Sequence, residues 1–249
     1  MSESSFKIRE KTIIVFGPIT SLAQSIGTIL LEHGADIAFL DENATASQRY
    51  INSLMDMRHV HSIYGRAATV NCTIQSAKDA KEAISRAAEL FGSADVLVDL
   101  NLFGRAESNG HTQSELMTNE ALEFLTGRGK GRVIYITVED RLCHTENTKP
   151  LIKENERLVK FMNEKILELN NKAITLNNIC VGYTEEVLLK LHPQKTIQSS
   201  FEEEKNNHAN SYMTQPVDIA NLVTFIASPI SSCLNGQRLH ANYALTIDK

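Results

Sequence analysis

The feature that most constrains this chain is a repeated alternation between short apolar runs and longer amphipathic stretches. The runs "TIIVFG" (12–17), "DIAFLD" (36–41) and "ADVLVDL" (94–100) are almost continuously apolar. Such runs are typical of strands buried on both faces of a sheet. Between the first two, "TSLAQSIGTILLEHGA" places Leu and Ile at helical spacing, and Gly34 predicts the end of that helix. Regular alternation of strands and helices predicts a parallel sheet covered by helices on both faces.

The rest of the chain continues the pattern. Further strands are expected at 67–72, 132–137, 174–181 and 237–241, and helices at 51–65, 76–92, 115–126, 153–170 and 216–228. The segment 196–211 is interpreted as a loose polar loop. Without an internal repeat or a linker, residues 1–249 are predicted to form one domain. The predicted fold class is α/β, with a doubly wound, seven-stranded parallel sheet.

Composition excludes several classes of partner. The net charge of −5 and a pI near 5.9 give no support for binding to nucleic acid or anionic membranes. No apolar run has transmembrane length, and the first residues resemble no signal peptide, so a cytoplasmic protein is expected. The cysteines show no CxxC pair and no nearby His at metal spacing. We interpret them as reduced thiols and predict no metal site; they are Cys72, Cys143, Cys180 and Cys233.

Taken together, several segments resemble the short-chain dehydrogenase/reductase family. They are "TIIVFG…HGADIAFLD", "ELFGSADVLVDLN", "GRVIYIT", "AITLNNICVG" and "QPVDIANLVTFIASPISSCLNGQRL". The resemblance extends over nearly the whole chain and is most specific in the last block. It implies one Rossmann-like domain and, for an intact member, a nicotinamide dinucleotide cofactor. Fold alone does not fix function, so the family's site residues have to be compared position by position.

The phosphate-binding turn of the family, TGxxxGxG, is only partly present. Gly17 is retained, but the second and third glycines fall on Ser21 and Ala23, and Pro18 removes one backbone donor. We therefore favour a plain strand-to-helix turn. Asp41, at the end of the second strand, either hydrogen-bonds an NAD ribose or is a solvated strand-end residue; both readings stay open. Gly17 and Asp41 are thus at most a remnant of the cofactor site.

Other cofactor positions differ from the family as well. Asp99 puts a negative charge where a neutral amide is usual, and Glu186 stands where the family has a Thr near the nicotinamide amide. A carboxylate near a pyrophosphate is repulsive by roughly 1 kcal/mol or more at short range. The segment "GRAESNGHTQSEL" is also expected to replace the start of a long helix, which would leave the site without one wall. We predict that this chain binds no cofactor.

The family's catalytic groups are missing at all three aligned positions. Its chemistry uses a Ser, a Tyr about thirteen residues later as the general acid, and a Lys four residues after the Tyr that lowers the Tyr pKa. Those positions fall on Val138, Leu151 and Asn155, and counting from "GRVIYIT" or back from Glu168 gives the same register. No catalytic residues are therefore predicted. Nearby polar residues that could substitute are Tyr135, Thr137, His144, Lys149 and Lys153.

An intact apolar pattern without an active site suggests a subunit that serves a partner. The family includes heteromeric dehydrogenases in which a catalytic subunit pairs with a degenerate one, such as the hydroxyacyl-CoA dehydrogenase of anaerobic toluene degradation, which acts on 2-[hydroxy(phenyl)methyl]succinyl-CoA. This chain resembles the inactive kind. We expect a heterotetramer with an intact short-chain dehydrogenase that carries NAD, packed through Val159, Phe161 and Ile166. Two alternatives stay open: a divergent stand-alone oxidoreductase, and a ligand-binding or sensory module.

Overall fold

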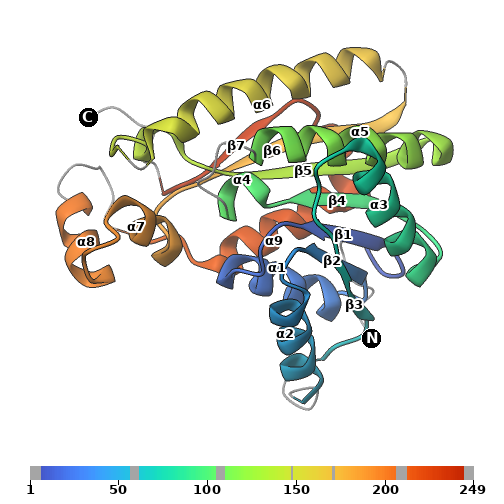
Figure 1. Ribbon diagram of the computed structural model, residues 1–249, viewed down its shortest axis with the longest axis horizontal. Coiled ribbons are helices and arrows are strands. Elements are labelled where there is room, and N and C mark those ends of the chain that lie inside the picture. The colour runs from blue at the N-terminus through green and yellow to red at the C-terminus, as the bar shows by residue number, and fades with distance from the viewer. Residues whose placement is uncertain are drawn as a thin grey trace.

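The computed structural model describes residues 7–56, 62–104, 110–146, 148–169, 172–205 and 212–243. In these residues seven strands form one parallel sheet in the order β3-β2-β1-β4-β5-β6-β7 (Figure 1). The strands are β1 (Thr12–Phe16), β2 (Asp36–Asp41), β3 (Ala67–Asn71), β4 (Val96–Asp99), β5 (Lys130–Val138), β6 (Ala173–Val181) and β7 (Arg238–Ala241). The doubly wound α/β fold expected from the sequence is confirmed.

Burial explains why the strand sequences lack polar alternation. Every residue of β1, β2 and β4 is buried, and β5 and β6 are exposed only at their first residues. The two edge strands, β3 and β7, are only partly buried. Central strands covered on both faces need apolar side chains in both directions, which gives the continuous apolar runs.

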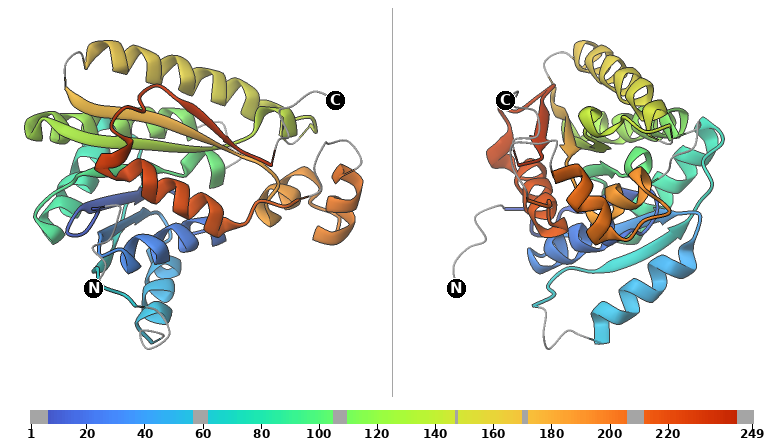
Figure 2. Two further views of the ribbon diagram at one scale, coloured as in Figure 1. Left: turned by 180° about the vertical axis from the view of Figure 1, so that it is seen from behind. Right: turned by 90° about the vertical axis from the view of Figure 1, so that its left-hand side faces the viewer.

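Helices cover both faces of the sheet, as the two rotated views show (Figure 2). One buried cluster joins the sheet to α1 (Ser21–Glu32), α2 (Ala44–Asp56), α7 (Glu185–Leu191) and α9 (Pro216–Ala227). The cluster on the opposite face includes residues of α3 (Ala77–Phe91), α5 (Gly110–Arg128) and α6 (Lys149–Glu168). The short helix α4 (Asn101–Gly104) follows β4, and α8 (Ile197–Lys205) lies beside α7 at one end of the molecule (Figure 1). No helix in the described part of the chain is both long and apolar enough to cross a membrane.

Two sequence expectations about this arrangement were wrong. The segment expected to replace the start of the helix between β4 and β5 is itself helical from Gly110, because α5 runs for 19 residues from there; residues 105–109 of that segment lie outside the described residues. The segment expected to be a polar loop contains α8, whose Glu204 is buried. Its remaining residues, 206–211, are not described. The buried carboxylate shows that tertiary contacts, which the local sequence does not reveal, hold α8 in place.

Helix boundaries also shift. The second helix begins at Ala44 rather than Ile51, and its expected continuation through 57–61 lies outside the described residues. The long helix α6 begins at Lys149 rather than Lys153, with Pro150 in its first turn, where a missing N–H removes no helical hydrogen bond. Its expected last residue, Asn170, is not described. The predicted end of α1 at Gly34 is confirmed by that residue's φ of 83°.

Strand order marks the switch point of the sheet, and the region outside the carboxyl ends of β1 and β4 is called the crevice. Connections leave β1 toward β2 on one side and β4 lies on the other, so the direction of winding reverses between β1 and β4. In open parallel sheets, ligands bind outside the carboxyl ends of the strands at this reversal. The residues that follow β1, β4, β5 and β6 are therefore the ones whose chemistry has to be examined.

Candidate functional site

The turn after β1 is packed directly against the turn after β4. Gly17 has a φ of 122°, a conformation that side chains rarely adopt, and a Cβ added there would lie 2.9 Å from the backbone nitrogen of Asn101. Backbone hydrogen bonds join the two turns to their neighbours: the Gly17 N–H donates to Leu40, and the Leu100 N–H donates to Phe16. The glycine that the sequence singled out as a cofactor remnant thus serves close packing of the chain on itself.

A carboxylate of the chain itself occupies the N-terminus of α1. Glu186 Oε1 accepts a hydrogen bond from the Leu22 backbone N–H at 3.2 Å and from the Ser21 hydroxyl at 2.5 Å. Thr20 caps the same turn by accepting from the Ala23 N–H at 3.2 Å. Helix N-termini attract anions because their backbone N–H groups are unsatisfied and the helix dipole is positive there. At this terminus the anion is supplied from within, by a residue far away in the sequence.

Local sequence explains how Glu186 reaches this position. Thr184, just after β6, caps α7 by accepting from the Val187 N–H at 3.2 Å, and this starts the helix with Glu185 and Glu186 in its first turn. Acidic residues are favoured in a first helical turn. The Glu that sequence comparison placed near a cofactor is therefore in the crevice, and it binds the α1 terminus.

One turn further along α7, a partly buried lysine joins the crevice to the β4 side. The Lys190 ammonium donates to the carbonyl oxygen of Phe103 and lies 5.1 Å from the centroid of the Phe103 ring. Burial lowers the Lys190 pKa to about 8, although Glu186 and Cys143 act in the opposite direction. Helix α7 is thus tied to both the α1 and the α4 sides of the crevice.

Two further carboxylates end buried strands. Asp99, the last residue of β4, is 2% exposed and accepts from the Asn101 N–H at 2.9 Å. Burial raises its pKa to about 6 against the effect of that hydrogen bond. Asp41 ends β2 and is also buried. Its suggested contact with a ribose stays a prediction.

The structure brings together the three positions that were aligned with the family's Ser, Tyr and Lys. Val138 ends β5, and Leu151 lies in the first turn of α6; both are buried in the same apolar cluster. Asn155, one turn later, donates from Nδ2 to the Val138 carbonyl at 2.9 Å and to Asp140 Oδ1 at 2.6 Å. The shared location agrees with the register deduced from the sequence. The group contains two hydrocarbon side chains and one amide that is engaged with its neighbours, so it offers no titratable acid or base.

The polar residues considered as substitutes do not converge on these positions. Tyr135 faces α5, where its hydroxyl lies 2.8 Å from that of Thr118, and burial raises its pKa above the usual range. The Thr137 hydroxyl donates to Asn178 at 3.1 Å. Lys149 pairs with Glu146 at 2.7 Å on the surface. Lys153 is exposed on α6.

The fifth of these candidates, His144, belongs to a polar group that sequence reasoning missed. Glu204 of α8 accepts a hydrogen bond from Tyr183 at 2.7 Å, and its other oxygen lies 2.7 Å from His192 Nε2 and 3.3 Å from His144 Nε2. These residues come from four separate segments, so no local motif could have indicated them. The group fastens α8 over the ends of β5 and β6. A second polar group lies at the ends of β5, β6 and β7.

In sequence, the chain is similar to proteins that are named as oxidoreductases. No protein-family model matches the chain. An uncharacterised oxidoreductase, YvaG of Bacillus subtilis (strain 168), is 23% identical over 96% of this chain and 97% of its own length. A diacetyl reductase that forms (S)-acetoin, from Staphylococcus epidermidis, is 22% identical over 92% of this chain and 96% of its own length.

Solved structures extend the likeness to the fold. An NAD⁺-bound xylitol dehydrogenase matches with a TM-score of 0.78 at 17% identity, covering 94% of this chain and 98% of that one. A variant actinorhodin polyketide ketoreductase with NADPH matches with a TM-score of 0.76 at 17% identity, covering 94% and 97%. The fold is that of the short-chain dehydrogenases and reductases. At these identities the likeness to solved structures establishes the short-chain dehydrogenase/reductase fold, and the chemistry has to be argued from the site itself.

Proposed function

We propose that this chain is a non-catalytic subunit of an oxidoreductase of the short-chain dehydrogenase/reductase type, and that it assembles with an intact member of the same fold that carries the cofactor. The observation on which this rests is the Glu186 carboxylate bound to the N-terminus of α1. A dinucleotide pyrophosphate would need the same backbone N–H groups. It would have to displace a carboxylate that is tethered to the fold and already hydrogen-bonded there.

The former catalytic positions support the same proposal. Carbonyl reduction needs a proton donor near the carbonyl oxygen, with a pKa matched to the working pH. Leu151 offers none, and the Asn155 amide already donates to Val138 and Asp140. On this proposal the chain has lost both cofactor binding and proton transfer but has kept a complete apolar core. This combination favours a function that depends on the folded structure and not on catalysis.

Exposed apolar residues suggest where a partner would pack. Leu167 on α6 is 80% exposed, and Tyr212 and Tyr243 form an exposed ring pair, with centroids 5.7 Å apart, near the N-terminus of α9 and the end of β7. Large exposed apolar and aromatic side chains are enriched at interfaces. Of the α6 residues expected to pack against a partner, Phe161 is buried within its own subunit, and Val159 and Ile166 are half-buried. The α6 part of the proposed interface therefore centres on Leu167.

The test is co-expression with an intact short-chain dehydrogenase from the same gene neighbourhood, followed by size-exclusion chromatography with mass detection. We expect a stable heterotetramer, because obligate interfaces of this kind bury on the order of 2,000 Å² or more. Leu167→Asp should release the chain from the complex. Leu90→Asp, an identical substitution at an exposed leucine of α3, is the control and should leave the complex intact. Leu151→Ala should leave the turnover of the complex unchanged. A monomer under all conditions would overturn the proposal of a partner.

Cofactor binding is tested on the chain alone by calorimetric titration with NADH and NADPH. We expect no binding at micromolar concentrations, and we expect the double variant Leu151→Tyr/Asn155→Lys to remain inactive, because Glu186 and Val138 are unchanged in it. Micromolar affinity in the unaltered chain would contradict the proposal. A hydroxyacyl-CoA substrate for the complex rests on the family resemblance only and would be tested last, with the assembled protein.

The names of the relatives favour a second candidate, a stand-alone oxidoreductase. YvaG is an oxidoreductase by name, and the Staphylococcus protein is a diacetyl reductase. On this alternative, α7 would have to move Glu186 away from α1 before a dinucleotide binds. Consumption of NADH or NADPH with diacetyl by the purified chain, unaccompanied by a partner, would decide for this alternative and against the first.

A further inference from the structure

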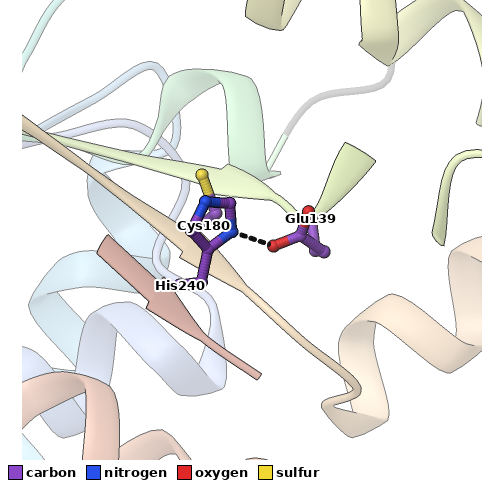
Figure 3. A group of neighbouring side chains, drawn as sticks. All are labelled: Glu139, Cys180 and His240. Atoms are coloured by element: carbon purple, nitrogen blue, oxygen red, sulfur yellow. Dashed lines mark hydrogen bonds and ion pairs between the residues drawn. The ribbon is translucent and has the colours of Figure 1, made fainter. Parts of the chain in front are cut away.

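Three side chains with metal-ligating atoms meet at the ends of the last three strands (Figure 3). Glu139 directly follows β5, Cys180 lies on β6, and His240 lies on β7. One ligand atom from each lies within 4.8 Å of the others, and in the part of the chain that the structure describes this is the one such group of three found. Cys180 and His240 are register partners in the sheet, so their side chains emerge side by side.

Hydrogen-bond donors surround the sulfur and the carboxylate. The Cys180 Sγ accepts from the Arg238 guanidinium at 3.4 Å and from the Asn178 amide at 3.6 Å. Glu139 Oε2 accepts from the Asn242 amide at 3.0 Å and lies 2.6 Å from His240 Nδ1. Donors that contact ligand atoms from outside orient those ligands and favour their charged forms. The cluster therefore has orienting contacts around its ligands as well as the ligands themselves.

The charges in and around the cluster indicate which kind of ion it could bind. The Arg238 guanidinium pairs with Asp140 Oδ2 at 2.8 Å, and the other Asp140 oxygen accepts from Asn155 at 2.6 Å. That pair is neutral overall, so Asp140 offsets part of the repulsion that the Arg238 guanidinium would exert on a bound cation. Metal binding would release the Cys180 thiol proton to solvent, and the resulting thiolate and the Glu139 carboxylate would together carry two negative charges. A divalent cation would bring this group to neutrality.

We propose that Glu139, Cys180 and His240 bind a divalent metal ion of the zinc type. The combination of thiolate, imidazole and carboxylate is one that Zn²⁺ accepts, whereas Mg²⁺ and Ca²⁺ prefer oxygen ligands alone. Tetrahedral zinc has bond lengths of about 2.0–2.3 Å, which separates ligand atoms by about 3.3–3.7 Å. The present contact of 2.6 Å between His240 and Glu139 would have to open by less than about 1 Å.

Access and location are consistent with this site. Glu139 and Cys180 are almost fully buried, and the His240 side chain is 37% exposed, so solvent reaches the cluster from the β7 side. With three protein ligands, a water molecule would complete a tetrahedral shell. The bound ion would join the ends of β5, β6 and β7. The proposal does not depend on whether the chain acts as a subunit or alone.

Cobalt substitution tests the site with a direct signature of the sulfur. The full chain, treated with a chelator and carrying Cys233→Ser to remove the exposed thiol, is titrated with Co²⁺. We expect sulfur-to-cobalt charge-transfer absorption that saturates at one ion per chain. Cys180→Ser should abolish the absorption, and Cys143→Ser, which removes a buried thiol outside the group, should retain it. Absence of the absorption in the starting protein, or its persistence in Cys180→Ser, would overturn the proposal.

Because Cys180 is buried, a variant at the half-exposed ligand guards against misfolding. His240→Ala should weaken the apparent Co²⁺ affinity at least about tenfold while its circular dichroism and thermal unfolding without metal stay close to those of the parent. Zn²⁺ at micromolar concentration should raise the thermal midpoint of the parent and leave that of His240→Ala unchanged. Equal affinity and equal thermal shifts in both proteins would mean an adventitious ion only, and would also overturn the proposal.

Discussion

At the carboxyl edge of the sheet, two regions differ in how the chain arranges its potential ligand-binding groups. In the crevice at β1 and β4, the chain places its own groups where a ligand would bind: Glu186 holds the α1 terminus, and the turn at Asn101 packs onto Gly17. At β5, β6 and β7, the groups Glu139, Cys180 and His240 converge on one another and are oriented by their neighbours. If both proposals hold, the same edge of one fold has lost one kind of site and assembled another, because the fold fixes where side chains meet and the sequence decides which ones.

The largest expected effect is on the packing of the crevice. Gly17→Val should lower the free energy of unfolding by about 3 kcal/mol or more, because the new side chain meets the Asn101 backbone and the φ of 122° is strained for any other residue. Urea denaturation measures it. Gly92 has a φ of 83°, and a Cβ added there would meet nothing within 4 Å, so Gly92→Ala measures the backbone strain alone. It should lower the free energy of unfolding by about 1 kcal/mol. Equal losses in the two variants would mean that the crevice is not closely packed.

The next effect concerns the charge at the end of β4. Burial raises the folded pKa of Asp99 to about 6, above its unfolded value of about 3.9. The folded state therefore binds the proton more tightly, and the free energy of unfolding should fall as pH rises from about 4 to 6. Asp99→Asn should remove this dependence and stabilise the protein by about 2 kcal/mol at pH 7, with little change at pH 4. An equal effect at both pH values would show that the charge of Asp99 is not responsible.

Lys190 should have a smaller effect on the free energy of unfolding, with the opposite dependence on pH. Burial lowers its folded pKa to about 8, from 10.5 in the unfolded chain. Between these values the unfolded state binds more protons, so the free energy of unfolding should rise with pH from about 8 to 10.5. The variant Lys190→Met keeps an unbranched side chain without the charge and should reduce that rise by about 1 kcal/mol. Urea denaturation at pH 8 and pH 10 compares the two proteins, and parallel pH profiles would contradict the assignment.

The smallest effect tests the contact between α7 and α1. Ser21→Ala removes one of the two hydrogen bonds to Glu186 and should lower the free energy of unfolding by about 0.5 kcal/mol. A double-mutant cycle with Glu186→Ala should give a coupling energy of similar size. Glu185→Ala, the neighbouring carboxylate in the same helical turn, is the control and should show no coupling to Ser21. Zero coupling for Glu186 would mean that the carboxylate does not hold the α1 terminus in solution.

The sequence predicted more of the crevice than of the group formed by Glu139, Cys180 and His240. The family's phosphate-binding turn drew attention to Gly17 and Ser21, and its Thr position after the sixth strand drew attention to Glu186. The spacing of the family's Ser, Tyr and Lys located Val138, Leu151 and Asn155. Spacing could place these residues in one region, but it could not show that Glu186 binds α1 itself. Glu139 and His240 are 101 positions apart, and no local pattern joins them. The scattered cysteines were interpreted only as free thiols for the same reason.

The sequence alone determined the layered fold of this protein. Continuous apolar runs that alternate with amphipathic stretches favour strands covered on both sides, and Gly34 and Pro216 fit the helix ends where the structure has them. Only the tertiary structure decided that α8 is a helix, that a carboxylate fills the α1 terminus, and that a thiol, an imidazole and a carboxylate meet at three strand ends. The physical reason is that secondary structure follows from the periodicity of neighbouring residues. Contacts between side chains distant in sequence depend instead on strand register and on how the helices pack across the sheet.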